Sequence, residues 1–328
     1  MATKDQLKAL IKCHAEGDNE RFYAIAMQVA AQEARSGHGR FAQELRELID
    51  QAKVRRDPSL PSVGTRPVPV LQPRGELAGL LSVTYPKTRL VDMVLDESVR
   101  DRLDQVILEQ RQQVRLAEHG FAPLRKLLLV GPPGTGKTMT AAAVAGELGM
   151  ALFTIQLDAL ITKFMGETAA KLRLIFDAIR ETRATYFFDE FDALGGDRGS
   201  KNDVGEIRRV LNSFLQFLEQ EESQSLIIGA TNHAGLLDRA LFRRFDAVVD
   251  YSIPTASEAL QVIRARLASV DVGAISWRSL SKAVSGLSHA ELAKACDQAA
   301  KNAILSGGNR IETKALIDAL KQRQDAKR

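Results

Sequence analysis

The sequence predicts an α/β fold in which a parallel sheet is covered by helices on both faces, with a small all-α domain before it and a further helical segment after it. Short, mostly apolar runs separated by helical patterns lie at 127–130, 152–157, 185–188, 225–230 and 247–251. Six of the ten prolines fall between Pro58 and Pro86, and the patterns after Pro254 are all helical. These three observations predict the order of the parts as well as the fold class.

Residues 1–56 are the first predicted part, an N-terminal helical domain. Apolar residues recur at helical spacing in three stretches, which are Leu7, Leu10 and Ile11, then Phe22, Ile25, Ala26 and Val29, then Phe41, Leu45, Leu48 and Ile49. The proline-rich segment 57–88 excludes a helix and predicts a linker, partly extended and partly disordered.

The second part, residues 89–254, begins with a long helical pattern over 97–118 and continues through the apolar runs. A strand that is buried on both faces is apolar throughout, so these runs predict a parallel sheet. The remaining residues, 255–328, predict a C-terminal helical subdomain with helices at 257–268, 277–284, 288–305 and 313–323.

Composition excludes several classes of protein. Basic residues exceed acidic ones by 45 − 41 = 4 without forming a dense strip, so nucleic-acid binding is not indicated. Cys13 and Cys296 form no paired-cysteine motif, which excludes a disulfide scaffold and a structural zinc site. No run approaches the ~18 apolar residues of a membrane span, and no apolar leader opens the chain. We therefore expect a cytoplasmic protein without membrane association.

The strongest motif is Gly-Pro-Pro-Gly-Thr-Gly-Lys-Thr at 131–138, between an apolar run and a helical pattern. It matches GxxxxGK[ST], in which backbone N–H groups and the following helix N-terminus bind phosphates, the lysine reaches the β and γ oxygens, and the threonine ligates Mg²⁺. The sheet is thus predicted to be that of a P-loop NTPase with ATP and Mg²⁺ as cofactors. The expected nucleotide contacts are Pro133, Gly134, Thr135, Gly136, Lys137, Thr138 and Met139.

Two acidic residues, Asp189 and Glu190, directly follow the apolar run at 185–188. Phosphoryl transfer needs a carboxylate for Mg²⁺ and a group that orients or deprotonates the attacking water. Asp189, together with Thr138, is assigned to the metal, and Glu190 is assigned to the water.

Three further polar residues follow apolar runs downstream. Asn232 suits polarisation of the same water, although asparagine is equally common in turns. Arg243 and Arg244 are adjacent, a pattern that in isolation is typical of surface salt bridges.

In order and spacing, these motifs resemble the AAA clade of the AAA+ ATPases, which includes katanin, spastin and the proteasomal ATPases. The resemblance covers about residues 89–325 and implies an ATPase with Walker A at 131–138 and Walker B at 186–190. The catalytic residues it implies are Lys137, Glu190, the sensor Asn232 and the arginine fingers Arg243 and Arg244. The Pro-Gly that separates these arginines in many members is absent, which leaves open which one touches the γ-phosphate.

The same resemblance implies a homo-oligomer. Arginine fingers of this family act on the neighbouring subunit's site, in a ring that is most often a hexamer. Phe164 and Met165, ahead of Gly166-Glu167, stand where members carry an aromatic pore loop that engages a polypeptide. The alternative is that Phe164 packs in the core at a helix end. Residues 255–328 resemble the family's C-terminal helical lid. No sensor-2 arginine is visible there, and His289 replaces a glycine that lies close to the nucleotide in the family.

The resemblance implies an ATP-driven protein remodeller, or unfoldase, whose N-terminal helices recruit the client. Such chains resemble bacterial ATPases encoded beside a subtilisin-like serine protease, and since no GxSxG or HExxH motif is present, any protease partner is expected to be a separate chain. Two other functions stay open. One is a nucleotide-gated binding module that regulates a partner such as a protease or toxin. The other is a nucleic-acid ATPase of the helicase-loader or transposition type, against which the Phe164 loop and the paired arginines argue.

Overall fold

The computed structural model divides into two compact units, residues 1–70 and 71–328. It describes residues 26, 27, 29, 30, 72–160, 165–190, 203–233, 235, 242–273, 275–308 and 310–326. In the first unit the four described residues are helical, and Ala26, Val29 and Ala30 are buried. The other predicted helical positions of residues 1–56 lie outside the described residues.

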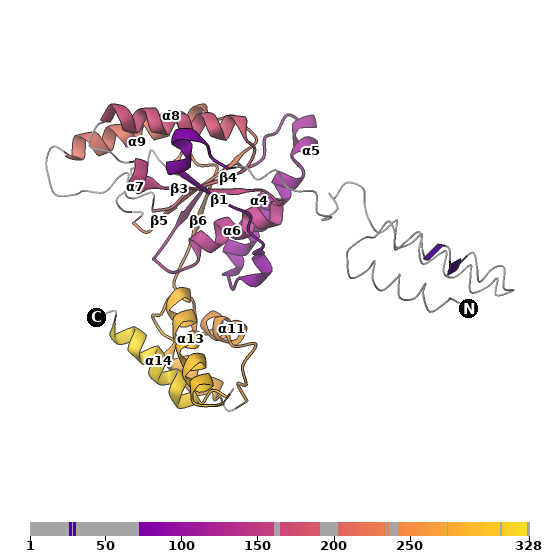
Figure 1. Cartoon of the computed structure of the whole chain (residues 1–328), viewed down its shortest axis with the longest axis vertical. Helices are drawn as coiled ribbons and strands as arrows, with labels where there is room; N and C mark the ends of the chain where they lie inside the picture. The colour runs from indigo at the N-terminus through magenta and orange to yellow at the C-terminus, as the bar shows by residue number, and fades with distance from the viewer. Residues whose placement is uncertain are drawn as a thin grey trace. The chain divides into compact units, whose positions relative to one another are not determined.

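A six-stranded sheet forms the centre of the second unit (Figure 1). Its strands are β1 (Leu81–Thr84), β2 (Lys126–Val130), β3 (Leu152–Ile155), β4 (Thr185–Phe188), β5 (Leu226–Thr231) and β6 (Ala247–Asp250), in the order β1-β3-β4-β5-β2-β6. Neighbouring strands are parallel except β1 and β3, which are antiparallel. The α/β class with a mostly parallel sheet is confirmed, and β2 to β6 match the five apolar runs to within a residue or two.

Helices cover both faces of this sheet (Figure 1). The helices of this part are α4 (Glu97–Arg111), α5 (Gln113–Glu118), α6 (Lys137–Leu148), α7 (Leu157–Leu160), α8 (Met165–Glu181) and α9 (Asp203–Gln220), with short 3-10 turns η1 (Gly75–Gly79) and η2 (Leu90–Asp92). Of these, α4 and α6 pack on one face, and α7, α8 and α9 pack on the other. In β2, Leu128 and Val130 belong to the core under α8 and α9, whereas Leu127 and Leu129 belong to the core under α4 and α6. Alternate residues of one strand enter opposite cores, which is why the run is apolar throughout.

Strand β1 lies within the segment 57–88 that the sequence predicts as a linker. Leu81 pairs with Ile155 and Thr84 with Leu152, and the Gln156 N–H donates to the Leu80 carbonyl at 2.9 Å. Pro73 and Pro86 flank this strand but do not interrupt it, and as an edge strand it needs to pair on one side only. A four-residue edge strand has too short a pattern to be recognised among prolines.

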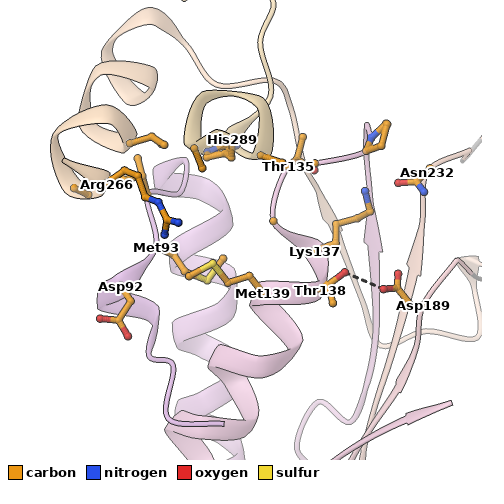
Figure 2. A pocket seen from close by; sticks show the side chains of 18 of the residues that line it. Asp92, Met93, Thr135, Lys137, Thr138, Met139, Asp189, Asn232, Arg266 and His289 are labelled. Carbon is orange, nitrogen blue, oxygen red and sulfur yellow. Dashed lines mark hydrogen bonds between the residues drawn. The ribbon is translucent and has the colours of Figure 1, made fainter. Parts of the chain in front are cut away.

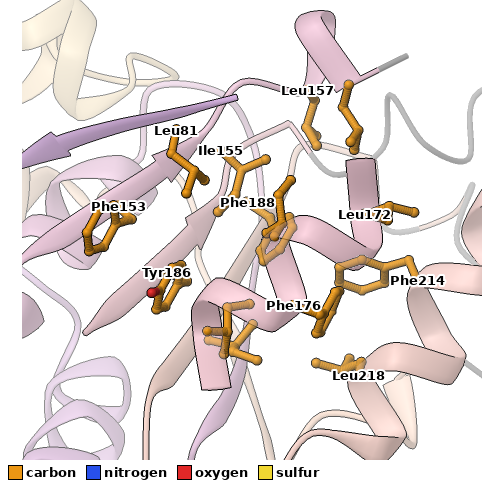
Figure 3. Packing of buried hydrophobic residues seen from close by; sticks show 14 of the residues in the cluster. Leu81, Phe153, Ile155, Leu157, Leu172, Phe176, Tyr186, Phe188, Phe214 and Leu218 are labelled. Carbon is orange, nitrogen blue, oxygen red and sulfur yellow. The ribbon is translucent and has the colours of Figure 1, made fainter. Parts of the chain in front are cut away.

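An aromatic cluster holds β4 under α8 and α9 (Figure 3). The Phe214 ring packs edge-on against Phe176 and Phe188, with ring centroids 5.6 and 5.1 Å apart, and all three side chains are fully buried. Because β4 ends at Phe188, this packing fixes the start of the acidic pair that follows.

The four predicted lid helices are α11 (Ala256–Arg266), α12 (Trp277–Ala283), α13 (His289–Leu305) and α14 (Thr313–Asp325), which share a hydrophobic core of their own. Capping boxes set the starts of two of them, with Thr255 and Glu258 at α11 and Ser288 and Glu291 at α13. Of the helices that the structure describes, none has the length and apolar character that crossing a bilayer requires.

Candidate functional site

The loop between β2 and α6 is a tight turn that requires glycine at two positions. Gly136 has φ +104°, in the left-handed region that glycine favours. A Cβ at Gly131 would lie 2.3 Å from the Tyr251 carbonyl oxygen, so no side chain fits there. The phenol of Tyr251 shares a 2.6 Å hydrogen bond with Thr140 of α6, and burial raises the pKa of that phenol to about 12. The loop is therefore held at its start by the residue that leads out of β6.

Lys137, the first residue of α6, extends back along this loop. Its Nζ donates to the carbonyl oxygens of Gly131 at 2.7 Å and Pro132 at 2.9 Å, and only 6% of the residue is exposed. The ammonium group and the positive end of the α6 helix dipole thus concentrate positive charge at one end of the loop, as an anion site requires.

The carboxyl ends of β4 and β5 bring Asp189, Glu190 and Asn232 to the same place, because these strands are parallel to β2 and lie beside one another on one side of it. The Thr138 hydroxyl donates to Asp189 Oδ2 at 2.9 Å (Figure 2). Glu190 follows in the left-handed region with φ +51°, and its N–H donates to Asp189 Oδ1 at 2.9 Å. A non-glycine residue with this φ is uncommon and here turns the chain directly after the metal candidate.

These residues line one pocket of about 610 Å³, a volume suited to a small-molecule ligand. All seven predicted nucleotide contacts, Pro133 to Met139, line it, as do Asp189, Glu190 and Asn232. The structure thus brings together the P-loop, the acidic pair and Asn232, which come from three separate stretches of sequence.

Comparison with known proteins decides the family. Residues 127–253 match the family described as "ATPase family associated with various cellular activities (AAA)". Over 320 residues the chain is 32% identical to the AAA family ATPase y4kL of Sinorhizobium fredii, with 98% of this chain and 95% of that protein covered. The chain belongs to the AAA family of ATPases. It is an enzyme that binds a nucleotide and hydrolyses ATP.

Two further relatives of this AAA ATPase are longer proteins. It is 32% identical over 258 residues to the ATP-dependent zinc metalloprotease FtsH 3 of Sphaerobacter thermophilus, an alignment covering 75% of this chain and 52% of that one. It is 33% identical over 235 residues to a proteasome-activating nucleotidase of Saccharolobus islandicus, covering 69% and 60%. The chain therefore spans between half and three fifths of the length of these two relatives.

The two adjacent arginines of the AAA ATPase lie in different environments. Arg243 is exposed, whereas Arg244 is partly buried and its Nε lies 2.6 Å from Glu219 Oε1, near the end of α9. Neither residue is among the described residues that line the pocket. Of the predicted pore loop, Phe164 lies outside the described residues, and Met165 is the first residue of α8.

Sequence reasoning missed one whole wall of the pocket. Asp92 at the end of η2 lines it together with Met93 and Val94, which follow. The lid contributes residues of α11 and α13, namely Val262, Ala265, Arg266, His289, Ala290 and Ala293. The lid also bonds to the P-loop directly, since the Ala290 N–H donates to the Gly134 carbonyl at 3.0 Å. Only His289 carried a signal, as a departure from the family pattern, and burial lowers the pKa of its imidazole.

Proposed function

We propose that this AAA ATPase is a ring-forming protein remodeller that hydrolyses ATP in the pocket described above and engages polypeptide clients through Phe164 and Met165. The observation that carries the proposal is the composition of the pocket. The P-loop, Asp189, Glu190 and Asn232 line it, whereas Arg243 and Arg244 do not.

The pocket residues have the chemistry that ATP hydrolysis needs. Thr138 and Asp189 offer two oxygen ligands already 2.9 Å apart, a donor set that fits Mg²⁺, which would neutralise phosphate charge. Lys137 binds the β and γ oxygens. Glu190 accepts a proton from the attacking water, and the amide of Asn232 orients that water beside the γ-phosphate.

The arginines make the site an intersubunit one. We propose that Arg243 reaches the γ-phosphate in the neighbouring protomer, and that Arg244 helps to position that segment through its contact with Glu219. A site completed by a neighbour explains why a pocket with the other parts of an ATPase has neither arginine in its lining. Head-to-tail contacts form a ring where the rotation between neighbours closes on itself, and we propose such a ring of six protomers.

The relatives suggest what the ring does. One is named a proteasome-activating nucleotidase and another an ATP-dependent metalloprotease, so both names join nucleotide use to proteolysis. By analogy, we propose that this ATPase acts on polypeptides, that its N-terminal helices recruit them, and that any protease it serves is a separate chain. We place it in the cytoplasm.

The solution mass of the Glu190→Gln protein tests assembly. Removing the general base should leave ATP bound and unhydrolysed, so addition of Mg-ATP should shift the mass from 36.0 kDa to about six times that value. Light scattering after size-exclusion chromatography, with and without Mg-ATP, measures it. A particle that stays monomeric with ATP bound would contradict the ring and favour a nucleotide-gated binding module.

Substitution of Phe164 tests client engagement. With denatured casein as a probe polypeptide, hydrolysis by the wild-type ring should rise, and Phe164→Ala should lose most of this casein-dependent increment because the loop no longer grips the chain. The matched control is Phe121→Ala, which removes another phenylalanine, 67% exposed and far from the predicted loop in sequence. Equal stimulation of both variants would show that Phe164 is not a pore-loop residue.

A further inference from the structure

The pocket has two chemically different ends (Figure 2). Lys137 and Thr138 lie at one end beside Asp189, close to Asn232. At the other end lies the apolar side chain of Met93, from the turn after η2, and the lid adds the apolar residues Val262, Ala265 and Ala293 to the pocket lining. A nucleotide is charged at its phosphates and has flat, weakly polar faces at its base, so the apolar end suits the base.

One cationic side chain stands at this apolar end. Arg266, the last residue of α11, lines the pocket and lies beside Met93 and Asp92 in Figure 2, on the far side from Lys137. With 53% of its side chain exposed, its guanidinium is open to a ligand. Planar guanidinium groups stack on aromatic rings and lose little hydration when they do so.

A neighbouring helix fixes the orientation of this guanidinium. Its Nε and Nη2 donate to Oδ1 and Oδ2 of Asp297 in α13, both at 2.7 Å. The pair raises the pKa of Arg266 and lowers the pKa of Asp297, so both groups stay charged around neutral pH. Because this contact uses one edge of the guanidinium, it sets the plane of the group and leaves its faces available.

We propose that Arg266 stacks its guanidinium plane on the nucleobase, with Asp297 as the positioning residue, and that this contact favours purine over pyrimidine nucleotides. A purine offers a larger π surface than a pyrimidine and therefore gains more from stacking. The inference rests on the nucleotide site assigned above, but adds a residue outside all the motifs that define that site.

The rival explanation is that Arg266 attracts the phosphates by charge alone. The two explanations differ in which ligands are affected. A stacking contact acts only on ligands that carry a base, whereas a charge effect acts equally on inorganic pyrophosphate. Nucleoside diphosphates and pyrophosphate, which avoid hydrolysis during the titration, separate the two.

The test uses calorimetric titration of the full chain with ADP, UDP and pyrophosphate, each with Mg²⁺. For Arg266→Ala we expect ADP affinity to fall about tenfold, UDP affinity to fall less, and pyrophosphate affinity to stay within about twofold of wild type. The matched control is Arg264→Ala, two residues earlier on the same helix, whose guanidinium carbon lies 4.6 Å from the centre of the Trp277 ring. The control should bind all three ligands as wild type does.

Two conservative variants sharpen the assignment. Arg266→Lys keeps the charge but not the plane, so the preference for ADP over UDP should stay reduced. Asp297→Asn keeps the size of the side chain but removes the charge from its hydrogen bonds to Arg266, so the guanidinium is less firmly oriented. ADP affinity should therefore fall by less than in Arg266→Ala.

Three results would overturn the inference. They are unchanged ADP affinity in Arg266→Ala, an equal loss for ADP and UDP, and a loss for pyrophosphate as large as the loss for ADP. Retained ADP binding in Lys137→Ala would instead overturn the nucleotide site itself, whatever Arg266 does.

Discussion

The Lys137→Ala protein is expected to bind ATP at least about 100-fold more weakly than wild type and to show no hydrolysis above background. The Lys137 ammonium lies along the loop and supplies its main cationic group, with 6% of the residue exposed. Two charge-assisted hydrogen bonds to phosphate oxygens, at about 1.5–3 kcal/mol each, account for a loss of this size.

Lys171→Ala is the control for this experiment. Its Nζ also donates to a backbone carbonyl, that of Ala159 at 2.9 Å, but Lys171 is in α8 and does not line the pocket. Calorimetric titration with ATP and the thermal unfolding midpoint should be measured for both variants. If the folded Lys137→Ala protein binds ATP as tightly as Lys171→Ala does, the phosphates bind elsewhere.

The fold could be predicted where burial leaves a clear pattern. Strands β2 to β6 are covered on both faces, so their runs are apolar and stand out from the helices between them. Where a helix breaks without a glycine or proline, the sequence predicts the helical region but not the break. The single helix predicted over 97–118 is two helices, α4 and α5, with a break at Gln112 (φ −104°, ψ 20°) that no glycine or proline marks.

The site could be predicted only where chemistry requires a fixed spacing. The P-loop and the acidic pair are contiguous motifs, and parallel strand order brings them together. The lid wall has no such requirement, since Val262, Ala265 and Ala293 are ordinary apolar helix residues until the lid places them on the pocket. The pairing of Arg244 with Glu219 depends likewise on where α9 ends relative to β6.

Arg243→Ala is expected to act on turnover rather than on binding, lowering kcat by about 10³–10⁵ with little change in ATP affinity. This corresponds to about 4–7 kcal/mol of lost transition-state stabilisation. Arg243 is exposed and does not line the pocket of its own chain, so its removal should leave the bound ground state intact. Arg244→Ala is the informative comparison, because a larger loss there would reverse the roles proposed for the two arginines.

Mixing variants tests whether the arginine acts on a neighbour. Arg243→Ala protomers keep an intact pocket, and Lys137→Ala protomers keep an intact arginine, so each homogeneous protein should be inactive. In a random equal mixture, about one quarter of head-to-tail interfaces join an intact pocket to an intact arginine. Hydrolysis should therefore reappear when the two proteins are denatured together and refolded as one population. Persistent inactivity of that mixture, with assembled rings present and wild-type protein refolding to full activity, would rule out action in trans, because only a contact within one chain fails to complement.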